Sequence, residues 1–153
     1  MKTLNQFTDK VRQWVDNHPL INDFGTGPTS LIGLSKSMKF PYMWMNFAQD
    51  HTIKIDTNIT PVPSLHFIFM DKTNKNINLD RDGNGLETTD GMEVKSDTYR
   101  LVLDFVNWLT ELSTIKLDGD ARVRSIIDES KEISSGWMVT VNIKMMYLEC
   151  NII

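Results

Sequence analysis

Residues 65–70 read Leu65-His66-Phe67-Ile68-Phe69-Met70, an apolar run that contains one histidine. Successive side chains of a β-strand point to opposite faces, so this run places large apolar groups on both faces of a sheet. A strand that is apolar on both faces is typical of the interior of a sheet, where both faces are covered. The sequence therefore predicts a central strand over residues 65–70.

Two further strands are expected before this run. Residues 40–47 carry large apolar side chains, and Pro41 fits the start or the edge of a strand because it has no N–H to donate. Residues 52–59 alternate isoleucine with charged side chains, and Pro61-Val62-Pro63 is expected to end that strand. Residues 19–38, rich in Gly, Pro, Ser and Thr, are expected to form a loop.

Two amphipathic helices are expected on either side of these strands. Apolar residues recur at three- and four-residue spacing over residues 3–17, and His18-Pro19 should end that helix because proline disfavours a helical residue before it. The same periodicity over residues 97–113 predicts a second helix, with Ser96 or Asp97 as its cap.

Two strands are predicted to close the chain. Residues 121–129 place Val123 and Ile127 on one face and two arginines on the other, and residues 137–149 alternate in the same way. Ser134-Ser135-Gly136 is expected to form the hairpin turn between them. The order α-β-β-β-α-β-β with short connections predicts one α+β domain over residues 1–153, a mostly antiparallel sheet with two helices packed on one face.

The segment 71–97 is expected to be a long acidic loop or arm. It has seven acidic and four basic residues, and the whole chain has 20 acidic and 16 basic residues, a net charge of −4. A net negative charge argues against a protein whose function is to bind nucleic acid. Loops of this length inside a compact domain are usually functional or mobile.

Composition excludes several further classes of protein. With 41% hydrophobic residues and 24% charged residues the chain of 153 residues is globular, and it can bury a core without disulfides. The lone Cys150 allows no intramolecular disulfide. No apolar run approaches the roughly 20 residues of a membrane span, and no signal peptide is visible, so we expect a soluble protein made in the cytosol.

The strongest chemical motif is Asp80-Arg81-Asp82-Gly83-Asn84-Gly85, which looks like the start of a calcium-binding loop. The eighth position is Glu87 instead of an apolar residue, and the twelfth is Gly91 instead of the bidentate glutamate. A tight turn in a solvated loop is the favoured interpretation. A small calcium- or ligand-binding module using Asp80, Asp82 and Asn84 stays open as the alternative.

No catalytic constellation is found in the sequence. The three histidines, His18, His51 and His66, have no metal-ligand spacing, and nucleophile elbow, phosphate loop and dinucleotide fingerprint are all missing. We therefore predict a protein that is not an enzyme, with no catalytic residues, no cofactor and no metal. An enzyme accessory or immunity-type binding protein of the same architecture is a further alternative.

Nine methionines and four tryptophans are many for this chain, and several lie in strands whose two faces both carry large side chains. One interpretation is a methionine-rich core. The other is that the second apolar face of the sheet is buried against a partner subunit, since the helices cover one face only.

Three blocks resemble the tail-terminator (tail-completion) proteins of tailed bacteriophages and the neck ring proteins of crAss-like phages. They are Trp14-Val15-Asp16-Asn17-His18-Pro19 followed by Ile21-Asn22-Asp23-Phe24-Gly25, then Lys39-Phe40-Pro41-Tyr42-Met43-Trp44, then Met92-Glu93-Val94-Lys95-Ser96-Asp97. The predicted order of helices and strands also looks like that fold.

The resemblance implies a structural virion protein without enzyme activity, made in the host cytoplasm. It implies a homo-oligomeric ring of six or twelve copies in the head–tail connector, neck or tail. The partners would be portal, neighbouring neck-ring or tail proteins, and genomic DNA would pass through the lumen without specific binding. The final strand, residues 137–149, is expected to face the lumen or a neighbour.

Overall fold

A computed structural model describes most of the chain. For residues 47–51, 89–92, 128 and 145 it describes the backbone alone, and the described ranges are 4–32, 38–55, 59–72, 89–128 and 134–145.

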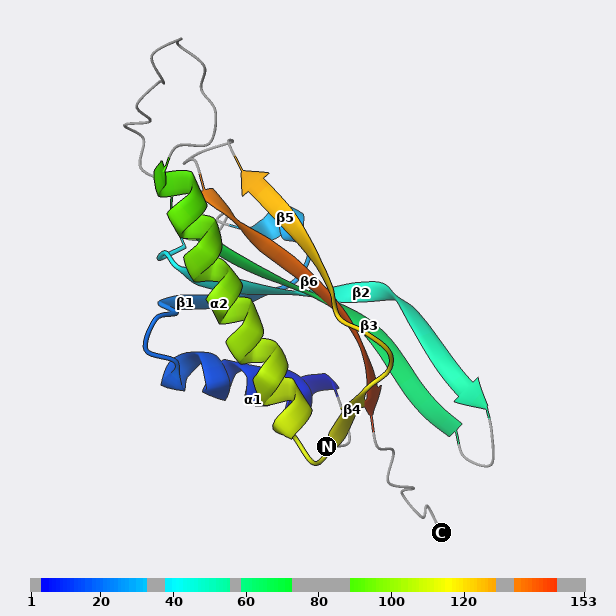
Figure 1. The fold of residues 1–153 in the computed structure, drawn as a ribbon. Helices are drawn as coiled ribbons and strands as arrows, with labels where there is room; N and C mark the ends of the chain where they lie inside the picture. Colours follow the sequence, from blue (N-terminus) through cyan, green and yellow to red (C-terminus); the bar gives the residue numbers. More distant parts are fainter. Residues whose placement is uncertain (1–3, 33–37, 56–58, 73–88, 129–133, 146–153) are drawn as a thin grey trace.

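The structure is a single α+β domain in two layers, and this confirms the predicted fold class (Figure 1). The elements in chain order are α1 (Leu4–Asn17), β1 (Asp23–Thr26), the short 3₁₀ helix η1 (Thr29–Leu31), β2 (Tyr42–Ile55), β3 (Ile59–Lys72), α2 (Thr89–Glu111), β4 (Ile115–Leu117), β5 (Arg122–Asp128) and β6 (Ser134–Met145). The sheet has six strands in the order β1-β2-β3-β6-β4, and β5 also pairs with β6. β1 is parallel to β2, and the other pairs are antiparallel.

The strand that contains residues 65–70 is central, as predicted. β3 pairs with β2 on one side and with β6 on the other. Leu65, Phe67 and Phe69 belong to the core under the helices, whereas Ile68 and Met70 belong to a second cluster on the opposite face. All five side chains are at most 6% exposed, so both faces of this strand are buried.

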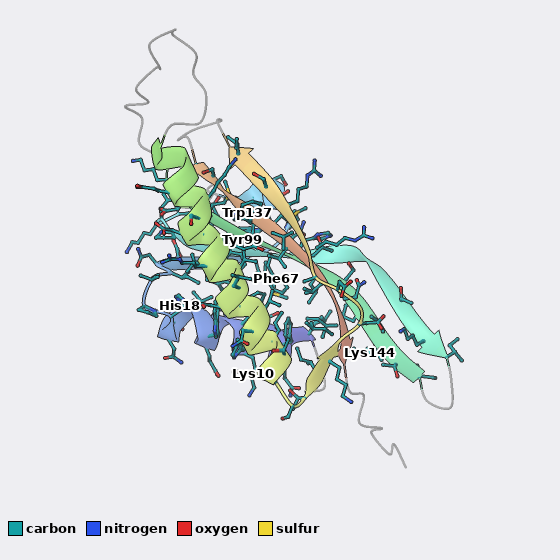
Figure 2. All side chains as sticks on the ribbon, in the orientation of Figure 1. Lys10, His18, Phe67, Tyr99, Trp137 and Lys144 are labelled. Atoms are coloured by element: carbon teal, nitrogen blue, oxygen red, sulfur yellow. The ribbon has the colours of Figure 1, made fainter. Side chains whose placement is uncertain are left out.

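Both helices pack on the same face of the sheet, as expected. α1 contributes Phe7, Val11 and Val15 to the core, and α2 contributes Phe105 and Leu109 among others. The Phe105 ring lies 4.6 Å from the Phe67 ring and 5.2 Å from the Trp14 ring, between centroids. This one side chain therefore joins the sheet and both helices. Figure 2 shows Phe67 under α2.

The opposite face of the sheet carries a second apolar cluster that the chain covers itself. Its buried members are Tyr42, Trp44, Ile68 and Met70, and partly buried residues packed against them include Ile32, Met38 and Phe40. Trp44 Nε1 donates a hydrogen bond to the Gly27 carbonyl at 2.9 Å. For these residues, burial against a partner subunit is the wrong interpretation, because the segment that follows β1 covers them.

The strands before β3 differ from the prediction. The loop expected over residues 19–38 contains β1 and η1, and the two strands expected over 40–47 and 52–59 are one strand, β2, whose pairing is irregular between Phe47 and His51. Pro61-Val62-Pro63 lies inside β3. β6 pairs with β3 only from Ser64 onward, so these prolines have one neighbouring strand, and a missing N–H is tolerated on such an edge.

The second helix starts earlier than predicted. α2 begins at Thr89, so Ser96 and Asp97 lie inside it, and the loop prediction for 71–97 is wrong for β3 through Lys72 and from Thr89 onward. The first turns of α2 are polar, so the apolar periodicity that predicts a helix begins only later in the sequence. In this part of the helix Thr98 is buried, and its hydroxyl donates a hydrogen bond to the Val94 carbonyl at 2.7 Å.

The closing hairpin is also different from the expectation. β5 is found where it was predicted, but Ser134-Ser135-Gly136 is the start of β6, paired with both β5 and β3. β4, which the sequence analysis missed, pairs with the last residues of β6. β6 is thus an interior strand of this sheet, and β5 takes the edge. Residues 146–149 of the predicted strand lie outside the described residues.

Candidate interaction surface

The calcium-binding hypothesis concerns residues 80–84, which lie outside the described residues, as does Cys150. Among the side chains that the structure does describe, no group of three or more His, Cys, Asp or Glu could hold a metal ion. Within the same part of the chain, neither helix is long and apolar enough to span a membrane.

Two of the three histidines have described side chains, and both have hydrogen-bond partners. His66 Nδ1 lies 2.9 Å from Thr140 Oγ1 on the sheet face opposite the helices. His18 follows the last residue of α1: its Nδ1 accepts from the Leu20 N–H, and its Nε2 lies 3.2 Å from Asp104 Oδ2. Its ring packs on Trp14 at 4.9 Å between centroids. These contacts join α1 to α2 and are structural.

A surface pocket lies between the end of α1, β3 and α2, with Leu20, Asp71, Asp97 and Arg100 in its lining. Burial raises the pKa of Asp71; a hydrogen bond from the Lys72 N–H lowers it, and the nearby Asp97 raises it again. Asp97 and Arg100 at this pocket lie open to solvent.

The most unusual surface is the outer part of the β2–β3 hairpin, residues 52–55 and 59–62, which we call the arm. Ile53 is paired with Pro61, and Ile55 with Ile59. Residues directly opposite in an antiparallel pair share a face, and so do residues two apart, so these four side chains form one apolar face. The exposed fractions of Ile53, Ile55 and Ile59 are 59%, 80% and 65%. Figure 1 shows the arm projecting away from both helices.

An ion pair joins the arm to the turn after β4. Lys54, on the strand between the two exposed isoleucines, places Nζ 2.7 Å from Asp118 Oδ1 in the turn after β4. Lys144 of β6 places its Nζ 3.4 Å from the same oxygen. The Lys54 hydrogen bond is the largest cause that lowers the pKa of Asp118, and Lys144 adds to it.

Further exposed apolar side chains lie on α2 and on the edge strand β5. Tyr99 and Leu103 of α2 are 41% and 52% exposed, and Val123 and Ile127 of β5 are 38% and 51% exposed. Tyr99 packs edge-on against Trp137, with ring centroids 5.3 Å apart, as Figure 2 shows. In the described part of the chain β5 pairs only with β6, so its other edge offers backbone groups for a further strand.

The alternation of Ile53 and Ile55 is visible in the sequence, but it predicts an ordinary strand and no exposed apolar surface. The sequence does not show which residues pair with them in the hairpin: Ile59 and Pro61 lie on the same face because of the observed register.

No protein-family model matches this chain, and no curated protein matches it in sequence.

Proposed function

We propose that this chain is a structural virion protein of a tailed bacteriophage, a ring-forming subunit of the head–tail connector, neck or tail terminator. Its activity is assembly, with copies of itself and with portal, neck-ring or tail proteins, around the path of the genomic DNA. The resemblance of the three sequence blocks supports the phage assignment. The exposed surfaces of the fold support the assembly.

The observation that carries the proposal is the apolar face of the arm. Single exposed apolar residues are common on protein surfaces, but a continuous exposed patch marks an interaction site. Three isoleucines, each more than half exposed, lie beside or opposite one another on a hairpin that extends away from its own core. Covering them would contribute about 1 kcal/mol or more for each side chain. This free energy is available only when another molecule packs against the arm.

The shape of the fold suits side-by-side packing. The arm projects in one direction, and the edge of β5 that has no partner strand among the described residues lies elsewhere on the same chain (Figure 1). A contact between two different surfaces of identical subunits is heterologous, and it produces a ring when its rotation closes. A neighbouring subunit would then pack against the arm, and the pairing of β2 with β3 holds the arm in a fixed position.

The experiment is self-association measured by light scattering over a wide range of protein concentration. The native chain is expected to form oligomers, seen as rings by negative-stain electron microscopy, whereas Ile53→Ser with Ile55→Ser is expected to stay monomeric. Leu20→Ser is the matched control, because Leu20 is 60% exposed but lies outside the arm.

Two outcomes would contradict the proposal. One is a native chain that remains monomeric both alone and when co-expressed with portal and tail proteins. The other is association that the arm variant retains at the level of the Leu20 control.

A further inference from the structure

The sheet face opposite the helices carries a row of basic side chains on a chain that is acidic overall. Arg122 and Arg124 are paired with Thr140 and Met138, and Lys116 is paired with Lys144, all on the face opposite the helices. We call Lys116, Arg122, Arg124 and Lys144, together with Lys54 of the arm, the basic stripe. The chain as a whole has a net charge of −4, so this stripe is a local reversal of sign.

Part of the stripe is neutralised internally and part is not. Asp118 is bonded to Lys54 and Lys144, and Asp120 lies exposed in the same turn. Lys116, Arg122 and Arg124 are exposed and form no ion pair within the described residues. Three cations along one sheet edge are therefore available to an anionic surface.

An acidic ridge of similar length runs along α2. Glu93, Asp97, Asp104 and Glu111 are spaced by four and seven residues, which places them on one side of a helix, and all four are exposed. Arg100 is the basic residue beside them. From residue 93 to 111 the helix rises about 27 Å, and Lys116 and Arg124 lie opposite Lys144 and Met138, six residues apart on β6, a span of about 20 Å.

The two charged surfaces lie on opposite layers of one domain. The buried residues of α2, such as Leu101 and Phe105, face the sheet, and the ridge lies on the flank of α2 next to the end of α1, where Asp97 lines a pocket with Asp71 and Asp104 contacts His18, on the helix side of the sheet. The stripe lies on the other side of the sheet. They cannot meet within a single chain, and they can meet only between two chains.

We propose that the basic stripe of one copy docks on the acidic α2 ridge of the next copy. This inference rests on the proposed function and specifies its interface: a second copy of this chain is the occupant, because the two surfaces carry complementary charge and the stripe is short enough to fit along the ridge. The contact is head-to-tail, since each copy presents one surface of each sign, and such a contact propagates around a ring. Electrostatic complementarity of this kind sets partner choice and register.

The test is a pair of charge-reversed variants. The stripe variant is Arg122→Glu with Arg124→Glu, and the ridge variant is Asp97→Lys with Glu111→Lys; Asp104 is left intact because it contacts His18. Each variant alone cancels most of the charge of one of the two surfaces and is expected to associate at least about tenfold more weakly than the native chain at low salt. Mixed in equal amounts they are expected to regain association, because the native stripe of one variant then meets the native ridge of the other, and the introduced glutamates meet the introduced lysines.

The control is Lys10→Glu with Lys39→Glu, which makes the same change in net charge as the stripe variant at exposed positions outside both surfaces. It is expected to associate like the native chain, and circular dichroism checks that each variant is folded. The native association should weaken between about 50 and 500 mM salt, as screening shortens the range of the charges.

The outcomes separate the two proposals. If the native chain associates and the reversed variants do so equally well, or if the mixture gains nothing, the docking inference is wrong while self-assembly stands. If the native chain is monomeric throughout, both are wrong. A monomer that binds labelled duplex DNA of about 30 base pairs through Arg122 and Arg124 would overturn the inference in favour of a nucleic-acid surface.

Discussion

Lys54 Nζ of the β2–β3 arm lies 2.7 Å from Asp118 Oδ1 in the turn between β4 and β5. This pair joins two segments that are 64 residues apart in the chain. It holds the exposed isoleucines of the arm in a fixed position relative to the sheet edge. A surface that is ordered before binding has less conformational entropy to lose when a partner docks.

Replacing Asp118 by asparagine tests that link through pH. The Lys54 hydrogen bond lowers the pKa of the folded-state carboxyl, so its stabilisation is present above the unfolded-state pKa and is lost as pH falls through the folded-state pKa. Asp118→Asn is therefore expected to lower the unfolding temperature at neutral pH by up to about 2 °C, with the difference vanishing in acid. Thermal unfolding followed by circular dichroism at several pH values measures it. Asp120→Asn, in the same turn, is the control, and a pH-independent difference would contradict the assignment.

Replacing Asp71 is expected to change the stability of the fold in the opposite direction. Burial raises the pKa of its carboxyl, so the folded state binds its proton more tightly than the unfolded state, and stability falls as pH rises through the window between the two pKa values. Asp71→Asn should consequently stabilise the fold at neutral pH, by less than about 1 kcal/mol, and give no gain in strong acid. Urea denaturation at two pH values measures this, and a gain that persists in acid would show that charge is not its cause.

Phe105 is expected to be a major contributor to stability. Its side chain is 0% exposed and contacts the rings of Trp14, Phe67, Phe69 and Trp108. Phe105→Ala leaves a cavity between both helices and the sheet and is expected to cost about 3–5 kcal/mol in free energy of unfolding. Leu103→Ala, on the exposed side of the same helix, should cost less than about 1 kcal/mol. Equal losses for the two variants in urea denaturation would contradict this packing.

Gly136 is required by the close pairing of β6 with β3. A Cβ atom built on it would lie 1.7 Å from the Phe69 carbonyl oxygen, so any larger residue must push the two strands apart. Gly136→Ala is expected to destabilise the fold by about 3 kcal/mol or more. At Gly119 the space is open and only its positive φ of 81° opposes a side chain, so Gly119→Ala should cost about 1–2 kcal/mol. A Gly136 variant as stable as the Gly119 variant would mean that the strands are not packed this closely.

Those parts of the fold that depend on local patterning follow from the amino-acid sequence alone. The stripe of Phe7, Val11 and Val15 predicted α1, and residues 65–70 predicted a central strand, because each pattern has the period of its own element. The same reasoning predicted the α+β class and the position of β5. It failed at Ser134-Ser135-Gly136, where turn-forming residues lie inside a strand.

Strand pairing and the choice of exposed surfaces, in contrast, depend on the folded chain as a whole. Long-range register placed Pro61 and Ile59 opposite Ile53 and Ile55, and it put the second apolar cluster under the chain's own segment around Phe40. Charge signs were visible in the sequence, but their separation onto α2 and the β4–β5 edge follows from the layering of helices on one sheet face. Local propensity acts over a few residues, whereas pairing and burial depend on residues far apart in the chain, and so the exposed surfaces could be identified only in the folded chain.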